Sequence, residues 1–186
     1  MIDNSRFFEF ISFNNVGEYI FSNPIRPYFG NKFFPIFYSE VWGDYWGYFT
    51  FTSRFLDIGR NQMAIGSYLG RVNMVSLVTT IIIFFFFIKG VKNSKNILTI
   101  NLINYSVILS FVGYFLFVVL YQTGSQGDTI KATYMTQFIN LVVFVSAISI
   151  ESIKNKKTYS FIILTLTVIF IHNFQSFLSH FPIFYP

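Results

Sequence analysis

Apolar residues along the chain gather into four long runs that short polar stretches separate. The first run, residues 72–88, carries no charged side chain and ends in eight consecutive Ile and Phe residues. Three further runs cover residues 97–121, 132–150 and 159–178. Since a helix that crosses a bilayer needs roughly 20 predominantly apolar residues, the pattern predicts an all-α membrane protein with about four transmembrane helices.

Residues 1–71 contain no such run and mix aromatic, polar and charged side chains. Residues 5–21 are expected to be helical. Pro35 follows Phe34, and because a proline disfavours helix through the residue before it, a break is expected there. We interpret residues 1–71 as one aromatic-rich segment and residues 72–186 as the four-span region.

A juxtamembrane helix is expected to lead into the first span. It is predicted to begin near Gln62 and to continue into residues 72–88 without a break. Gly66 and Gly70 lie four residues apart within it, a spacing that would let another helix approach closely. A loose segment at the membrane surface explains the two glycines equally well.

The distribution of basic residues predicts the orientation in the membrane. The connections after the first and third spans hold six lysines, namely Lys89, Lys92, Lys95, Lys154, Lys156 and Lys157. The connection after the second span holds Lys131, and three arginines, Arg54, Arg60 and Arg71, precede the first span. Because Lys and Arg accumulate in cytoplasmic loops, this excess of six over four predicts that residues 1–71 are extracytoplasmic.

Composition agrees with a membrane protein and narrows the chemistry. Charged residues make up 11% of the chain, against about a quarter in soluble domains. The net charge of +5 arises from the lysine-rich loops, since the six acidic and six basic residues of 1–71 cancel. We interpret this charge as a sign of topology and expect no nucleic-acid partner. The chain has no cysteine, two histidines and no phosphate-binding or dinucleotide motif, so neither a cofactor nor a metal is predicted.

The densest candidate for chemistry is YSEVWGDYWGYF, residues 38–49. In a helix, Glu40 and Asp44 would share one face. Trp42 and Trp46 would likewise share one. Acids among aromatic rings suit substrate binding to a sugar, whose apolar faces stack on rings and whose hydroxyls donate to carboxylates, and such an acid could also act as a general base. Alternatively, the stretch is an interfacial aromatic belt whose acids pair with nearby arginines.

A second candidate is GDTIKATY, residues 127–134, at the start of the third span. Asp128 or Thr129 is expected to cap the helix N-terminus. Lys131 falls in the first turn, where the helix dipole repels a cation, so an anion is expected nearby. A phosphate would satisfy the free amides and the ammonium together. The alternative is that Lys131 extends to the lipid headgroups.

Arg71 stands at the matching end of the first span. If spans one and three are neighbours, Arg71 and Lys131 could grip one lipid phosphate, and we include Tyr134 among the predicted lipid-phosphate-binding residues. His172, Asn173 and Gln175 are polar at membrane depth, so they are expected to face protein or water rather than lipid, and we interpret them first as packing residues.

The order of three motifs resembles the C-terminal part of the family 39 glycosyltransferases. The motifs are YSEVWGDYWGYF, then SYLGRVNMVSL leading into a span, then GDTIKATYM at the start of a later span. These multi-span enzymes of the C class are related to protein mannosyltransferases and to the aminoarabinose transferase of lipid A. The resemblance implies transfer of a sugar from a polyprenyl-phosphate donor to an acceptor at the outer face of a prokaryotic plasma membrane.

In that family an acidic residue of the first outer loop acts as the base or orients the acceptor, and no stretch of this chain corresponds to that loop. The chain is therefore expected to be part of a longer or split protein, inactive alone, with its catalytic residues unassigned. The expected partners are the lipid-linked donor, membrane lipid, and either missing spans or a partner membrane protein. The alternative function is a small multi-span subunit or scaffold without chemistry. A transporter half is disfavoured, because the spans lack paired ionisable residues.

Overall fold

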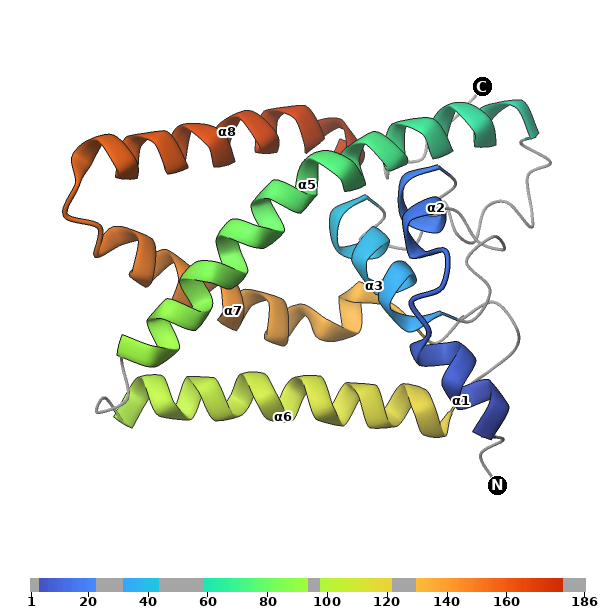
Figure 1. Cartoon of the computed structure of the whole chain (residues 1–186), viewed down its shortest axis with the longest axis horizontal. Helices are drawn as coiled ribbons and strands as arrows, with labels where there is room; N and C mark the ends of the chain where they lie inside the picture. Colours follow the sequence, from blue (N-terminus) through green and yellow to red (C-terminus); the bar gives the residue numbers. More distant parts are fainter. Residues whose placement is uncertain (1–3, 23–31, 44–58, 94–97, 122–129, 179–186) are drawn as a thin grey trace. The chain divides into compact units, whose positions relative to one another are not determined.

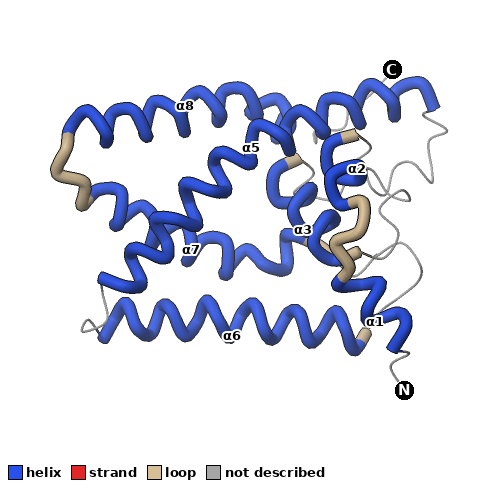
Figure 2. Tube along the Cα trace, in the orientation of Figure 1, coloured by secondary structure: helices blue, strands red, loops and turns tan. Residues whose placement is uncertain are grey.

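Every regular element in the described part of the chain is a helix (Figure 1; Figure 2). The structure is a computed structural model that describes residues 4–22, 32–43, 59–93, 98–121 and 130–178. Three short helices come first, namely α1 (Asn4–Ile11), α2 (Val16–Phe21) and α3 (Phe33–Trp42). The later elements are the long helices α5 (Gly59–Asn93), α6 (Leu98–Leu120), α7 (Thr136–Glu151) and α8 (Lys156–Leu178), with the four-residue 3₁₀ turn η1 (Ala132–Met135) directly before α7.

Within the described ranges, four helical segments are long and apolar enough to cross a membrane, which confirms the predicted all-α architecture. They are Tyr68–Asn93, Leu98–Leu120, Ala132–Glu151 and Lys156–Phe174. The third begins as a 3₁₀ turn before it becomes α-helical at Thr136. α5 is 35 residues long and begins three residues before Gln62, so the expected continuous helix into the first span is also confirmed.

The chain divides into two compact units. The first unit comprises residues 1–75, 117–133 and 172–186, and the second comprises residues 76–116 and 134–171. The first unit contains the short helices and one end of each span. The second unit contains the remainder of the four spans.

Aromatic rings join the short helices of the first unit. The rings of Phe10 on α1 and Phe33 on α3 lie 5.5 Å apart, and Phe13 stacks on Phe34 at 4.6 Å. Phe10 and Phe33 are fully buried. Helices of eight to ten residues are marginal by themselves, so this aromatic core stabilises α1 and α3 against each other.

The break expected at Pro35 does not occur. Pro35 lies inside the first turn of α3, which begins at Phe33. The first N–H groups of a helix have no acceptor within it, so a residue without an N–H is tolerated there. Its position in the first turn explains why the proline does not interrupt the helix.

Gly70 of α5 is in close contact with the backbone of α2. A Cβ atom at this position would collide with the carbonyl oxygen of Phe21. The close approach predicted for this glycine is therefore confirmed, and α2 is the element that approaches.

The second unit packs α5 against α7 through small residues. A Cβ atom at Gly90 would lie 2.8 Å from Val145 Cγ1, so only glycine fits without a shift. Ser146 of α7 donates a hydrogen bond to Ile83 O of α5 at 2.9 Å. Small residues and an interhelical hydroxyl are the usual means of bringing membrane helices together, because apolar burial gives little preference for helix over lipid.

Candidate functional site

Asn73 connects α5 to both α2 and α3 in the first unit. Its side-chain amide donates to Ile20 O at 2.9 Å and to Ser39 Oγ at 2.7 Å. The Tyr38 hydroxyl donates to the backbone oxygen of Asn73 at 2.7 Å. Asn73 is fully buried; its NH₂ group is hydrogen-bonded as a buried donor should be, whereas its Oδ1 has no partner among the described residues. These bonds fix α3 against the start of the first span.

Glu40 of α3 is hydrogen-bonded to the start of the third span. The N–H of Ala132 donates to Glu40 Oε2 at 2.8 Å. Ala132 is the first residue of η1, so its N–H has no acceptor within its own helix. Because it accepts this hydrogen bond, the Glu40 carboxylate caps the start of η1 from another element. Glu40 is only 2% exposed, so the cap is buried.

This contact joins the two stretches that the sequence singled out separately. Glu40 belongs to YSEVWGDYWGYF, and Ala132 belongs to GDTIKATY. An anion was expected at the start of the third span because of Lys131, and the Glu40 carboxylate lies there, on the residue after Lys131. The N–H of Ala132 is consequently occupied within the protein. The predicted caps, Asp128 and Thr129, lie outside the described residues.

The predicted i, i+4 pairing on α3 is only partly described. α3 ends at Trp42, and Gly43 is its C-cap, so the helix that carries Glu40 stops two residues before Asp44. Trp42 is half-buried on the last turn. Asp44 and Trp46 lie outside the described residues.

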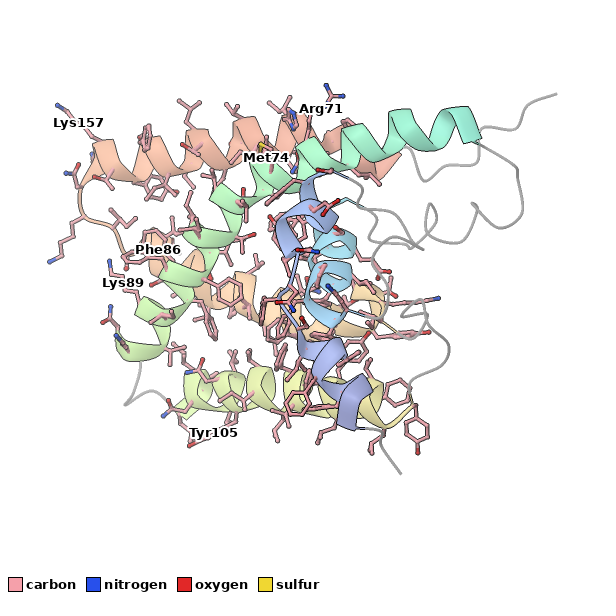
Figure 3. All side chains as sticks on the ribbon, turned by 45° about the vertical axis from the view of Figure 1, so that its right-hand side comes forward. Arg71, Met74, Phe86, Lys89, Tyr105 and Lys157 are labelled. Carbon is pink, nitrogen blue, oxygen red and sulfur yellow. The ribbon has the colours of Figure 1, made fainter. Side chains whose placement is uncertain are left out.

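The three residues predicted to bind a lipid phosphate, Arg71, Lys131 and Tyr134, have different surroundings in the structure. Arg71 is exposed, and Figure 3 shows its side chain pointing outward from α5. It lies two residues from Asn73, about 200° around the helix, so it faces away from α2 and α3. Lys131, half-buried, precedes the residue that α3 contacts. Tyr134 belongs to the second unit, where it is 61% exposed and its ring lies 6.3 Å from that of Tyr114.

Near the end of α8, Asn173 is 3% exposed and lies 2.8 Å from the His172 ring through Oδ1 and Nδ1. The expectation that Asn173 packs against protein is confirmed, whereas His172 is exposed. Among the described residues, no three His, Asp or Glu side chains lie close enough together to hold a metal ion.

Asn73, Tyr38 and Ser39 were missed as site residues at the level of sequence. A signal existed for Asn73, because it is a lone amide near the start of an otherwise apolar span, and such a group must find a partner. Nothing in the sequence identifies Ile20 O and Ser39 as those partners.

No protein-family model matches the chain, and no curated protein or solved structure matches it either. The fold and the span lengths define a helical multi-pass membrane protein. The site that stands out within it is the hydrogen-bonded connection of α3 to the start of two spans, through Asn73 and Glu40.

Proposed function

We propose that this protein forms part of a membrane glycosyltransferase that takes its sugar from a polyprenyl-phosphate donor. The observation that carries the proposal is the bond between Ala132 N and Glu40. It brings an aromatic helix with an acidic residue next to a lysine at the start of a span. Aromatic rings suit a sugar and a lysine suits its phosphate, so a lipid-linked sugar is the ligand that both would recognise together.

In this proposal the residues have distinct roles. Lys131 contacts the donor phosphate, and Trp42 contributes to the wall on the sugar side. Glu40 is a positioning residue, because its carboxylate is bonded to Ala132 and holds α3 beside Lys131. In the reaction, an acceptor hydroxyl oxygen would bond to the anomeric carbon as the bond from that carbon to the phosphate oxygen breaks. Polyprenyl phosphate leaves, and the hydroxyl proton passes to a base contributed by further spans or a partner membrane protein.

A second candidate is a non-catalytic membrane subunit. It is favoured by the burial of Glu40 and by its use as a helix cap, since an acid held in this way stabilises the fold without needing a substrate. Arg71 points outward from α5 (Figure 3), a direction that supports the subunit more than a phosphate site shared by Arg71 and Lys131.

The test is binding of a polyprenyl phosphate and of the corresponding uncharged polyprenol to the full chain in phosphatidylcholine nanodiscs. We expect the phosphate to bind more tightly than the alcohol, and Lys131→Ala to weaken its binding about tenfold, as expected for a charge-assisted hydrogen bond. Lys157→Ala removes an exposed lysine of the second unit and is the matched control.

Equal binding of phosphate and alcohol would contradict the transferase. Equal weakening by Lys131→Ala and Lys157→Ala would mean that net charge alone attracts the lipid, and the non-catalytic subunit would then be the better account. Retention of the helical circular dichroism spectrum identifies variants that remain folded.

A further inference from the structure

A small pocket lies within the second unit, where α5 ends, α6 begins and α7 ends. Its volume is about 130 Å³. The lining residues are Gly90, Asn93, Ile100, Ile103, Val145, Ile148, Ser149 and Ser152. One part of the wall is therefore aliphatic, and the other carries an amide and two hydroxyls.

The hydroxyl of Ser149 distinguishes this pocket from a packing gap. Ser149 is 4% exposed, and its Oγ has no hydrogen-bond partner among the described residues. Ser146, one turn earlier on α7, differs in this respect, since its Oγ lies 2.7 Å from Val142 O and 2.9 Å from Ile83 O. A buried hydroxyl without an acceptor is costly, and an acceptor atom of a ligand in the pocket would satisfy the Ser149 hydroxyl.

Lysines accompany the lining residues in the sequence. Lys89 precedes Gly90, and Lys92 precedes Asn93. Figure 3 shows Lys89 beside Phe86 on the last turns of α5, where its ammonium lies 5.5 Å from the ring centroid. Lys154 follows Ser152 by two residues and is exposed. Glu151 is an exposed acidic residue of the same region, so the three lysines leave a positive excess there.

We propose that this pocket binds the interfacial part of an anionic phospholipid. Three properties of the ligand follow from the residues. It carries a phosphate, which the lysines attract, as basic pockets at the ends of membrane helices do. It carries an ester carbonyl below the phosphate, and the carbonyl oxygen accepts a hydrogen bond from the Ser149 hydroxyl. Its first acyl carbons lie against Ile100, Ile103 and Ile148. Inorganic phosphate lacks the last two properties, and a polyprenyl phosphate has no ester carbonyl.

The test measures lipids retained by the full chain in native mass spectrometry, with phosphatidylglycerol and phosphatidylcholine of matched acyl chains. We expect phosphatidylglycerol to bind preferentially, and Ser149→Ala to weaken it about fivefold, the change that corresponds to the loss of one hydrogen bond. Ser149→Leu fills the pocket and should abolish the preference. Ser106→Ala is the matched control, because the Ser106 hydroxyl is bonded to Leu102 O of its own helix.

Equal binding of the two lipids overturns the proposal. Preference for phosphatidylglycerol that survives Ser149→Leu in a folded variant also overturns it, because the lysines alone would then attract the lipid. Full displacement of the lipid by millimolar inorganic phosphate would show that an anion suffices, and would overturn the role of the ester and acyl parts. Because the probe and the variants differ from those used for polyprenyl phosphate, this proposal and the transferase can fail separately.

Discussion

The helices of the first unit and those of the second unit are held together by different kinds of contact. In the first unit, directional hydrogen bonds connect elements far apart in the sequence, from Asn73 to Ile20 and Ser39 and from Ala132 to Glu40. In the second unit, long helices approach at Gly90, and the Ser146 hydroxyl of α7 donates a hydrogen bond to Ile83 O of α5.

The difference follows from helix length and surroundings. The short helices of the first unit cannot form stably alone, so side-chain bonds and ring contacts must hold them. A membrane-spanning helix already satisfies its own backbone groups, and its neighbours add contact area through small residues. The described hydrogen bonds between elements of the first unit are therefore needed to keep its short helices folded. The hydrogen bond from Ser146 in the second unit adds to the contact between helices that are already stable in the membrane.

The largest expected effect is at Gly70. Gly70→Ala places a methyl group against the Phe21 carbonyl, a backbone atom that moves only if α2 moves. We expect a loss of about 3 kcal/mol in the free energy of unfolding, the upper end of the cost of overpacking. Unfolding in mixed detergent micelles measures the loss, and hydrogen exchange should show α2 and α3 opening.

Gly17→Ala on α2 is the control, since no atom lies within 4 Å of a Cβ there. Alanine favours helix over glycine, so this variant should be neutral or slightly more stable. An equal loss in both variants would mean that the close approach at Gly70 does not govern stability.

The next effect is at Asn73. Asn73→Ala removes two hydrogen bonds to other elements, and we expect a loss of about 2 kcal/mol at roughly 1 kcal/mol for each. Tyr38→Phe removes the single bond to Asn73 O and should cost about half as much. Asn140→Ala, at an exposed position of α7, is the control. If Asn73→Ala and Asn140→Ala have the same free energy of unfolding, Asn73 does not hold the first unit together.

The smallest effect is at Gly90 in the second unit. A methyl group there meets mainly the Val145 side chain, which can shift, so Gly90→Ala should cost only about 1 kcal/mol. The cost should fall further in a Val145→Ala background, because the obstructing methyl is then absent. Gly113→Ala is the control, with no atom within 4 Å of its Cβ. A cost at Gly90 as large as that at Gly70 would remove the contrast between the two units.

The spans were predictable because about 20 apolar residues suffice to specify a membrane helix, and the continuous α5 was predictable because nothing interrupts its helical residues from Gln62 onward. The start of α3 was not, because Pro35 interrupts a helix only when it lies beyond the first turn, and no local pattern identifies Phe33 as the first helical residue.

The candidate site was predictable in its parts and not in its connections. Glu40 and Lys131 stood out by residue type, and an anion was expected near Lys131 from the helix dipole alone. The identity of the anion depends on a contact across 92 positions, which no local pattern encodes. The pocket at Ser149 escaped notice because a serine in an apolar run gives no sign of whether its hydroxyl bonds to its own helix, as Ser106 does.

The bond from Ala132 to Glu40 also orders events during synthesis. The ribosome adds roughly 5 to 20 residues per second, so the 92 positions between the two partners correspond to roughly 5 to 18 seconds. Throughout that interval the carboxylate of Glu40 lacks this hydrogen bond, because Ala132 has not yet been synthesised. The first unit can complete its assembly only after the start of the third span has been synthesised. The finished hydrogen bond therefore forms only in chains whose third span has reached α3.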